Sequence, residues 1–137
     1  MAETPLISKL KLKPRQRAAL IGAPQGYLAE LSPLPEGVEL SDTLQGHYDW
    51  VQIFVHNQAE LETLLPDVIP ALKPESLLWI SFPKGTSMIQ TDLTRDKGWD
   101  ALQQVDLKWI NLVSINETWS AFSLRPYRPG EKRQSFR

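Results

Sequence analysis

The chain has 137 residues, of which 42% are hydrophobic, and it carries a net charge of −1 and no cysteine. This length supports one domain with a single core. The absence of cysteine excludes disulfides, thiolate metal sites and cysteine nucleophiles, and no other set of metal ligands is predicted. No apolar run approaches the roughly 18 residues of a membrane-spanning helix. We therefore expect a cytoplasmic protein without membrane contact.

The charge is unevenly distributed, because both ends of the chain are basic. Lysine and arginine alternate with leucine and proline in residues 9–17, which predicts an edge strand or an extended lead-in over residues 1–16. Residues 127–137 are basic with almost nothing apolar to bury, which predicts a disordered tail. A patch for nucleic acid or an acidic partner is the functional alternative. The net charge near zero argues against nucleic acid and favours solvated termini.

Residues 17–126 alternate strand-like and helix-like segments, the pattern of an α/β domain with a largely parallel sheet. Consecutive apolar residues predict a first strand over residues 17–22. A short helix is expected over 27–31, a weak strand over 38–40 and a strong strand over 50–55. These segments open a sheet of about six strands.

The second half of the domain begins with apolar residues at helical spacing over 59–72. Pro66 and Pro70 interrupt this pattern, so we expect a kink or two short helices. A central strand is predicted over 76–82 and a helix from about 95 to 105. Two β-rich runs, 107–115 and 119–124, are separated by a hairpin turn, so the last strand should run antiparallel to its neighbour. The five tryptophans fall on strands or a helix face and are predicted to be core residues: Trp50, Trp79, Trp99, Trp109 and Trp119.

This order of elements resembles a shortened class I methyltransferase domain, the Rossmann-like three-layer fold that binds S-adenosylmethionine. The stretches that carry the resemblance are LKPRQRAALIGAPQG, YDWVQIFVHN and ALKPESLLWISFPKG. The chain is also similar, over about residues 9–125, to a small bacterial family of unknown function. The shared features are the glycine-alanine-proline turn at 22–24, the proline-lysine pair at 83–84, TDLT at 91–94 and ETWS at 117–120.

The chain departs from the methyltransferase pattern in three places. The turn after the first strand holds only Gly22 and Gly26, and Pro24 lacks an N–H. Leu20 or Ile21 stands where the resemblance implies an acidic residue. One strand-helix unit is missing. For the acidic residue that binds ribose after the second strand, the resemblance offers Glu39 or Asp42.

In open α/β sheets, ligands bind beyond the carboxyl ends of the strands, where the strand order reverses. The first, third and fourth predicted strands should end side by side there. His56 is a candidate acid or base on this rim, with a hydrogen-bonded role at a helix start as the alternative. Asn57 is a predicted N-cap, and Asp92 is a second catalytic candidate that, like Thr94, also suits the N-cap of the helix near 95–105.

The loop over residues 81–95 concentrates cationic, hydroxyl and carboxylate groups before a predicted helix. Such a loop is typical of an anion site, although ordinary capping is the alternative. The candidate ligand-binding residues are Gly22, Gly26, Lys84, Thr86, Ser87, Thr91 and Arg95.

The preferred interpretation is a Rossmann-like domain that binds a small anionic ligand, a nucleotide or a protein partner, without methyltransferase catalysis. The alternative is a minimal S-adenosylmethionine-dependent methyltransferase with His56 or Asp92 near the acceptor. A third interpretation is a structural or oligomeric module, with the final hairpin as a homodimer surface. No cofactor is assigned; S-adenosylmethionine and a nucleotide are both compatible with the pattern.

Overall fold

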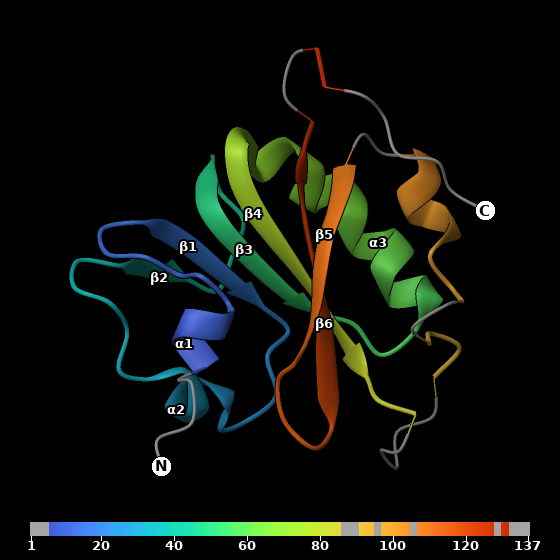
Figure 1. Cartoon of the computed structure of the whole chain (residues 1–137), viewed down its shortest axis with the longest axis horizontal. Coiled ribbons are helices and arrows are strands. Elements are labelled where there is room, and N and C mark those ends of the chain that lie inside the picture. The colour runs from blue at the N-terminus through green and yellow to red at the C-terminus, as the bar shows by residue number, and fades with distance from the viewer. Residues whose placement is uncertain (1–5, 86–90, 95–96, 105–106, 128–129, 132–137) are drawn as a thin grey trace.

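The computed structural model describes residues 6–85, 91–94, 97–104, 107–127 and 130–131. Its strands are β1 (Arg17–Ile21), β2 (Glu39–Ser41), β3 (Tyr48–Phe54), β4 (Leu72–Pro83), β5 (Leu107–Ser114) and β6 (Trp119–Pro126). They form one six-stranded sheet in the order β2-β1-β3-β4-β6-β5 (Figure 1). The predicted α/β fold is therefore confirmed, with β2 one residue later than expected and β4 four residues longer at its start.

Four neighbouring strands, β2, β1, β3 and β4, run parallel, and β6 runs antiparallel to both β4 and β5. Ala19 of β1 pairs with Val51 of β3, which pairs with Leu78 of β4. The carboxyl ends of β1, β3 and β4 therefore lie side by side, as the sequence predicts. The strand order reverses between β1 and β3, which makes this edge the expected ligand position.

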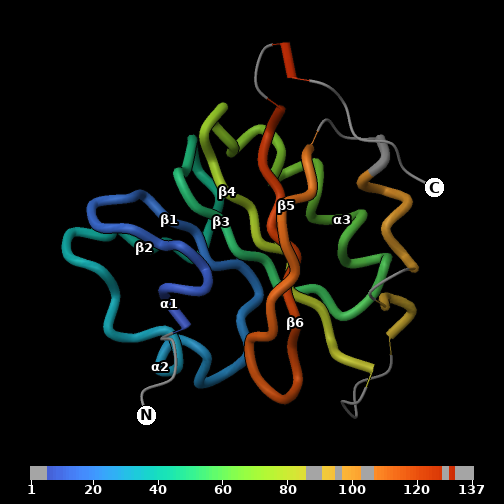
Figure 2. The backbone as a smooth tube through the Cα atoms, in the orientation of Figure 1, coloured from blue at the N-terminus to red at the C-terminus, as the bar shows by residue number. Residues whose placement is uncertain are grey.

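Helices cover both faces of the sheet (Figures 1 and 2). On one face, α1 (Leu6–Lys9) and α2 (Tyr27–Leu31) pack in a cluster with Trp50 and Trp79. On the other face, α3 (Gln58–Val68), η1 (Ile69–Ala71) and η2 (Asp100–Gln104) pack in a cluster with Val51 and Ile80. No helix in the described ranges is both long enough and apolar enough to cross a membrane.

The predicted break in the helical pattern over residues 59–72 is confirmed, because α3 ends at Val68 and a separate 3₁₀ turn, η1, follows it. The predicted helix over 95–105 is shorter than expected: residues 97–99 are not helical, and η2 is a 3₁₀ turn. Gly98 explains the difference. Its φ is +101°, and a Cβ at this position would lie 2.8 Å from the Asp92 carbonyl oxygen, so the chain turns there instead of continuing a helix. Residues 95–96 and 105–106 lie outside the described residues.

The lead-in is helical at α1 rather than extended throughout, and it is anchored to the sheet. The Leu10 carbonyl accepts hydrogen bonds from the indole N–H groups of Trp50 (2.8 Å) and Trp79 (2.7 Å). Leu10 and Leu12 are buried. The predicted burial of tryptophan is confirmed for four of the five, since Trp109 is half-buried. In the predicted tail, residues 128–129 and 132–137 lie outside the described residues.

A carboxylate near the start of β3 makes the fold pH-sensitive. Asp49 forms an ion pair with Lys73 and accepts the Arg17 N–H at 2.8 Å. The hydrogen bond from Lys73, then that from Arg17, lowers the pKa of Asp49 below its usual 3.8. A lowered pKa contributes stability that is present above the ordinary value and is lost as the pH falls through the folded-state pKa. The contribution is at most about 1 kcal/mol, because the pair is partly exposed.

We therefore expect Asp49→Asn to be less stable than the wild type at pH 7, with a difference that narrows on acidification below pH about 4. Urea unfolding of both proteins across this pH range measures the difference. A constant gap at all pH values would contradict the assigned role of the Asp49 charge.

Candidate functional site

The turn after β1 contains the two glycines that the sequence singles out. Gly22 has a φ of +73°, and a Cβ there would lie 3.1 Å from the Phe54 carbonyl oxygen of β3. Gly26 has a φ of +85°, caps α2, and has open space where a Cβ would be. Gly22 is therefore required by packing between strands, whereas the backbone at Gly26 remains approachable.

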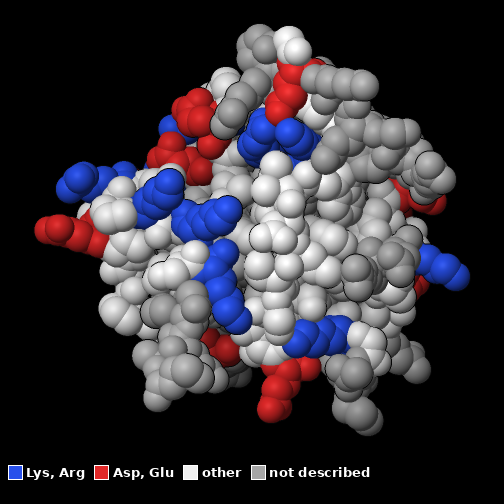
Figure 3. Space-filling model, viewed as in Figure 1, with Lys and Arg blue, Asp and Glu red and all other residues white. Residues whose placement is uncertain are grey.

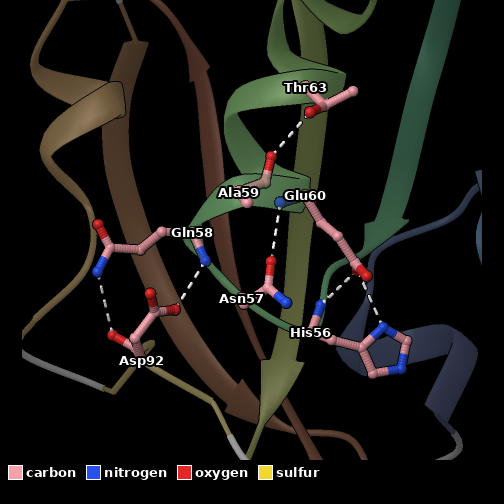
Figure 4. A network of polar contacts seen from close by, with 7 residues as sticks. All are labelled: His56, Asn57, Gln58, Ala59, Glu60, Thr63 and Asp92. Carbon is pink, nitrogen blue, oxygen red and sulfur yellow. Dashed lines mark hydrogen bonds and ion pairs between the residues drawn. The ribbon is translucent and has the colours of Figure 1, made fainter.

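The segment after β3 begins α3 with a network of polar contacts (Figure 4). Asn57 is the N-cap, as predicted, and its side-chain oxygen accepts the Glu60 N–H at 2.9 Å. The Glu60 carboxylate accepts the His56 N–H at 2.7 Å and lies 2.9 Å from His56 Nδ1. His56 therefore has the predicted helix-start contacts, and its side chain remains 48% exposed.

Glu60 is a site residue that the sequence reasoning missed. Burial raises its pKa, but the hydrogen bonds from His56 outweigh this effect, so the pKa lies below its usual range and the group is an anion at neutral pH. The spacing Asn57-x-x-Glu60 is a capping-box signature, which was the available signal.

Asp92 caps a different helix from the one predicted, and its candidacy as a catalytic residue stays a prediction. Its carboxylate accepts the Gln58 N–H at 2.8 Å, at the first turn of α3 (Figure 4). Asp92 thus caps the helix that precedes it in sequence rather than the one that follows. Together, Asn57 and Asp92 supply protein acceptors to the N-terminus of α3.

Removing the Asp92 cap should loosen the start of α3. We expect Asp92→Ala to cost about 1 kcal/mol of unfolding free energy, because it leaves the Gln58 N–H without this acceptor. Asp92→Asn keeps an acceptor oxygen and should recover most of the loss. Urea denaturation measures both variants, and equal losses would contradict this role.

Lys84 and Thr91 are the other candidate residues in the described part of the loop after β4. The Lys84 ammonium donates to the Ser114 hydroxyl of β5 at 2.6 Å. The Thr91 hydroxyl accepts the Leu93 N–H at 3.0 Å. Thr86, Ser87 and Arg95 lie outside the described residues, so their predicted roles remain predictions.

The structure separates the two ribose candidates. Asp42 directly follows β2, at the carboxyl edge of the sheet, and is exposed. Glu39 begins β2, and its N–H donates to the Gln16 carbonyl at the opposite end of the strand. Only Asp42 therefore lies at the predicted rim.

Two cavities open along this rim, and they share Ile21 and Leu64 as lining residues. The first has a volume of about 400 Å³ and is lined by Ile21, Gly22, Phe54, His56, Ala59, Glu60, Thr63 and Leu64. The second has a volume of about 570 Å³ and is lined by Ile21, Asp42, Thr43, Leu44, Leu64, Pro66, Asp67 and Pro70. We call the two together the rim trough.

The rim trough is apolar at its centre and acidic along its length. Its carboxylates are Asp42, Glu60 and Asp67, and its described lining contains no lysine or arginine. No group of three or more histidine, aspartate or glutamate residues in the described chain is placed to hold a metal ion. The trough thus combines an apolar floor with negative charge, a combination suited to a ligand that has apolar surface and positive charge.

The sheet order gives the chain a Rossmann-like α/β fold of the kind found in class I methyltransferases. The chain is similar to a ribosomal protein L11 methylase from Lactobacillus delbrueckii subsp. bulgaricus, with 15% identity and a TM-score of 0.60 over 89% of this chain and 75% of that one. It is also similar to a SAM-dependent methyltransferase from Aquifex aeolicus, with 10% identity and a TM-score of 0.59 over 87% and 86% of the two chains.

The structure of DhpI in complex with SAH gives a TM-score of 0.61 at 11% identity, over 89% of this chain and 82% of that one. No family model and no curated protein sequence matches the chain. At these identities, the likeness shows the fold alone.

Proposed function

We propose that this chain is a minimal S-adenosylmethionine-dependent methyltransferase domain that binds its cofactor in the rim trough. The observation that carries the proposal is the position of Asp42 and Gly22 at the ends of β2 and β1, on either side of the shared Ile21 and Leu64. A carboxylate at the end of the second strand is suited to binding ribose hydroxyls. The apolar floor is suited to packing against a base.

The charge of the rim trough favours this cofactor over an anionic ligand. S-adenosylmethionine carries a sulfonium and an ammonium group, which the carboxylates of Asp42 and Glu60 would attract. A nucleotide phosphate would be repelled by the same groups. Asn57 and Asp92 already supply acceptors at the N-terminus of α3, where an anion would otherwise bind.

The residues around the rim trough fit the cofactor despite the departures from the methyltransferase pattern. Gly22 and Gly26 allow the backbone of the turn to approach a ligand, although Pro24 removes one donor. The first strand ends at Ile21 without an acidic residue. Glu60, which lines the same cavity as Gly22, offers a carboxylate from α3 in its place.

His56 is suited to take a proton from an acceptor group. A carboxylate only accepts hydrogen bonds, so the contact with Glu60 favours the proton on His56 Nδ1 and leaves Nε2 as the proton acceptor. When bound, S-adenosylmethionine supplies an electrophilic methyl group. In this proposal His56 is the general base beside it.

Calorimetric titration with S-adenosylmethionine and with ATP tests the proposal, because the two share adenosine and differ in charge. We expect S-adenosylmethionine to bind and ATP not to bind. Asp42→Asn should weaken binding by about 1.5–3 kcal/mol, which is roughly ten- to hundredfold in Kd. Glu39→Gln, at the opposite end of the same strand, is the matched control and should bind as the wild type does. Preference for ATP, or equal effects of both variants, would overturn the proposal.

A second candidate is S-adenosylmethionine binding without methyl transfer. The short segments around the trough favour this candidate, because they offer little chain to hold a methyl acceptor. Residues 42–47 connect β2 to β3, and α2 has five residues. Formation of S-adenosylhomocysteine with an acceptor present distinguishes the two candidates.

A further inference from the structure

We propose that the face formed by the lead-in, α1 and the end of β5 is a docking surface for the phosphodiester backbone of a nucleic acid. The surface consists of Lys9, Lys11, Lys13 and Lys84 with the Ser114 hydroxyl, and we call it the lysine surface. Figure 3 shows lysine and arginine side chains spread over this face of the molecule. The proposal does not depend on cofactor binding in the rim trough.

The fold brings together cations that are far apart in the sequence. The Lys9 ammonium lies 3.5 Å from the Ser114 carbonyl oxygen, and the Lys84 ammonium lies 2.6 Å from the Ser114 hydroxyl. Lys9 and Ser114 are 105 positions apart. Two ammonium groups therefore meet at one residue of β5, next to a hydroxyl group. This convergence is not expected of a solvated terminus.

The backbone that carries the other two lysines is held in a defined conformation. Leu10 and Leu12 are buried, and the Leu10 carbonyl accepts two indole N–H groups. Lys11 lies between the two buried leucines and Lys13 follows the second of them. Both lysine side chains are exposed. Lys11 has a φ of +59°, an uncommon conformation for a residue with a side chain. The two side chains are thus held outward on a fixed segment.

Three of the lysines on this surface have no carboxylate partner in the described part of the chain. Among the described residues, no ion pair joins Lys9, Lys11 or Lys13 to a carboxylate, whereas Lys108 and Arg125 both pair with Glu131. Three acidic side chains, Asp42, Glu60 and Asp67, lie along the rim trough. Glu30 lies close to the lysine surface, because its carboxylate accepts the Asn116 side-chain N–H at 3.0 Å. A local group of lysines attracts a polyanion even when the net charge of the chain is −1.

The composition of the surface favours nucleic acid over other polyanionic partners. Protein interfaces are depleted in lysine, whereas lysine contacts to phosphates position proteins on nucleic acid. Amphipathic segments that lie in a membrane interface bury apolar side chains in the lipid. The large apolar side chains that are exposed in the described chain are only Leu28 and Ile110.

Fluorescence anisotropy with labelled single-stranded RNA and DNA, over about 25–200 mM salt, tests the proposal. We expect salt-dependent binding of at least one strand type. The double variant Lys11→Asn/Lys13→Gln should reduce the slope of log K against log salt by about 1.4, at roughly 0.7 per lost phosphate contact. Asparagine is chosen at position 11 because it tolerates positive φ.

The matched control is Lys73→Gln/Lys97→Gln, which changes the net charge equally. Lys73 lies in β4 beside Asp49, and Lys97 is exposed before η2. The control should retain the wild-type slope. Absence of binding to both strand types at low salt, equal slopes in both double variants, or binding only to phosphatidylserine vesicles would overturn the proposal.

Discussion

Gly22→Ala is expected to destabilise the protein by about 2–5 kcal/mol, whereas Gly26→Ala should cost about 1–2 kcal/mol. Both glycines have positive φ, which strains any residue with a side chain by roughly 1–2 kcal/mol. At Gly22 the added Cβ would also lie 3.1 Å from the Phe54 carbonyl oxygen, part of the β3 backbone. Relieving this contact requires a shift between adjacent strands and adds about 1–3 kcal/mol.

Urea denaturation of the two variants measures this difference, and each is the other's control. Equal losses would mean that the close approach of β1 and β3 at the rim is not as described. The result bears on the site as well, because Gly22 lines the rim trough beside Phe54.

Gln52→Leu should destabilise the protein by about 2–6 kcal/mol. Gln52 is fully buried in β3 and joins two hydroxyl groups on neighbouring elements. Its side-chain oxygen accepts the Tyr27 hydroxyl at 3.0 Å, and its NH₂ group donates to the Ser81 hydroxyl at 3.0 Å. Leucine leaves both hydroxyls buried without this partner, at about 1–3 kcal/mol each.

The double variant Tyr27→Phe/Gln52→Leu tests the cause of that loss. Burial raises the pKa of Tyr27, and this effect exceeds the opposing hydrogen bond to Gln52, so the phenol stays neutral and must be satisfied as a donor. The double variant removes the hydroxyl together with its acceptor. Its loss in free energy of unfolding should therefore be smaller than the sum of the losses in the two single variants. Strictly additive losses in thermal or urea unfolding would contradict the network.

Much of the fold follows from local signals in the sequence. Consecutive apolar residues predict β1 and β3 as strands covered on both faces, and the β-rich runs around Asn116 predict the antiparallel hairpin. Pro66 and Pro70 predict the interruption after α3. These signals are read over a few neighbouring residues, which is why the element order and the convergence of the parallel strand ends were predictable.

The site was less predictable, because its contacts join distant segments. The Asp92 carboxylate reaches Gln58, 34 positions away, and no local pattern distinguishes this cap from a cap on the next helix. The expected helix does not form at Gly98, because the chain turns there with a positive φ and lies close to the Asp92 backbone. This close approach exists only in the folded chain. The charge of the rim trough arises from Asp42, Glu60 and Asp67 together, which are separated in the sequence. The sequence directs attention instead to the loop over residues 81–95, where it predicts an anion site.

The most direct test of the central claim is a titration of ¹⁵N-labelled protein with S-adenosylmethionine, followed by two-dimensional NMR. The rim trough lies where β1, β2 and β3 end, so we expect the amide signals of Gly22, Asp42 and Glu60 to shift together and to saturate with one affinity. Signals at Glu39 and Lys73, at the opposite edge of the sheet, should remain unchanged. No saturable change in the rim signals, or shifts centred on Lys84 and Thr91 instead, would contradict the account.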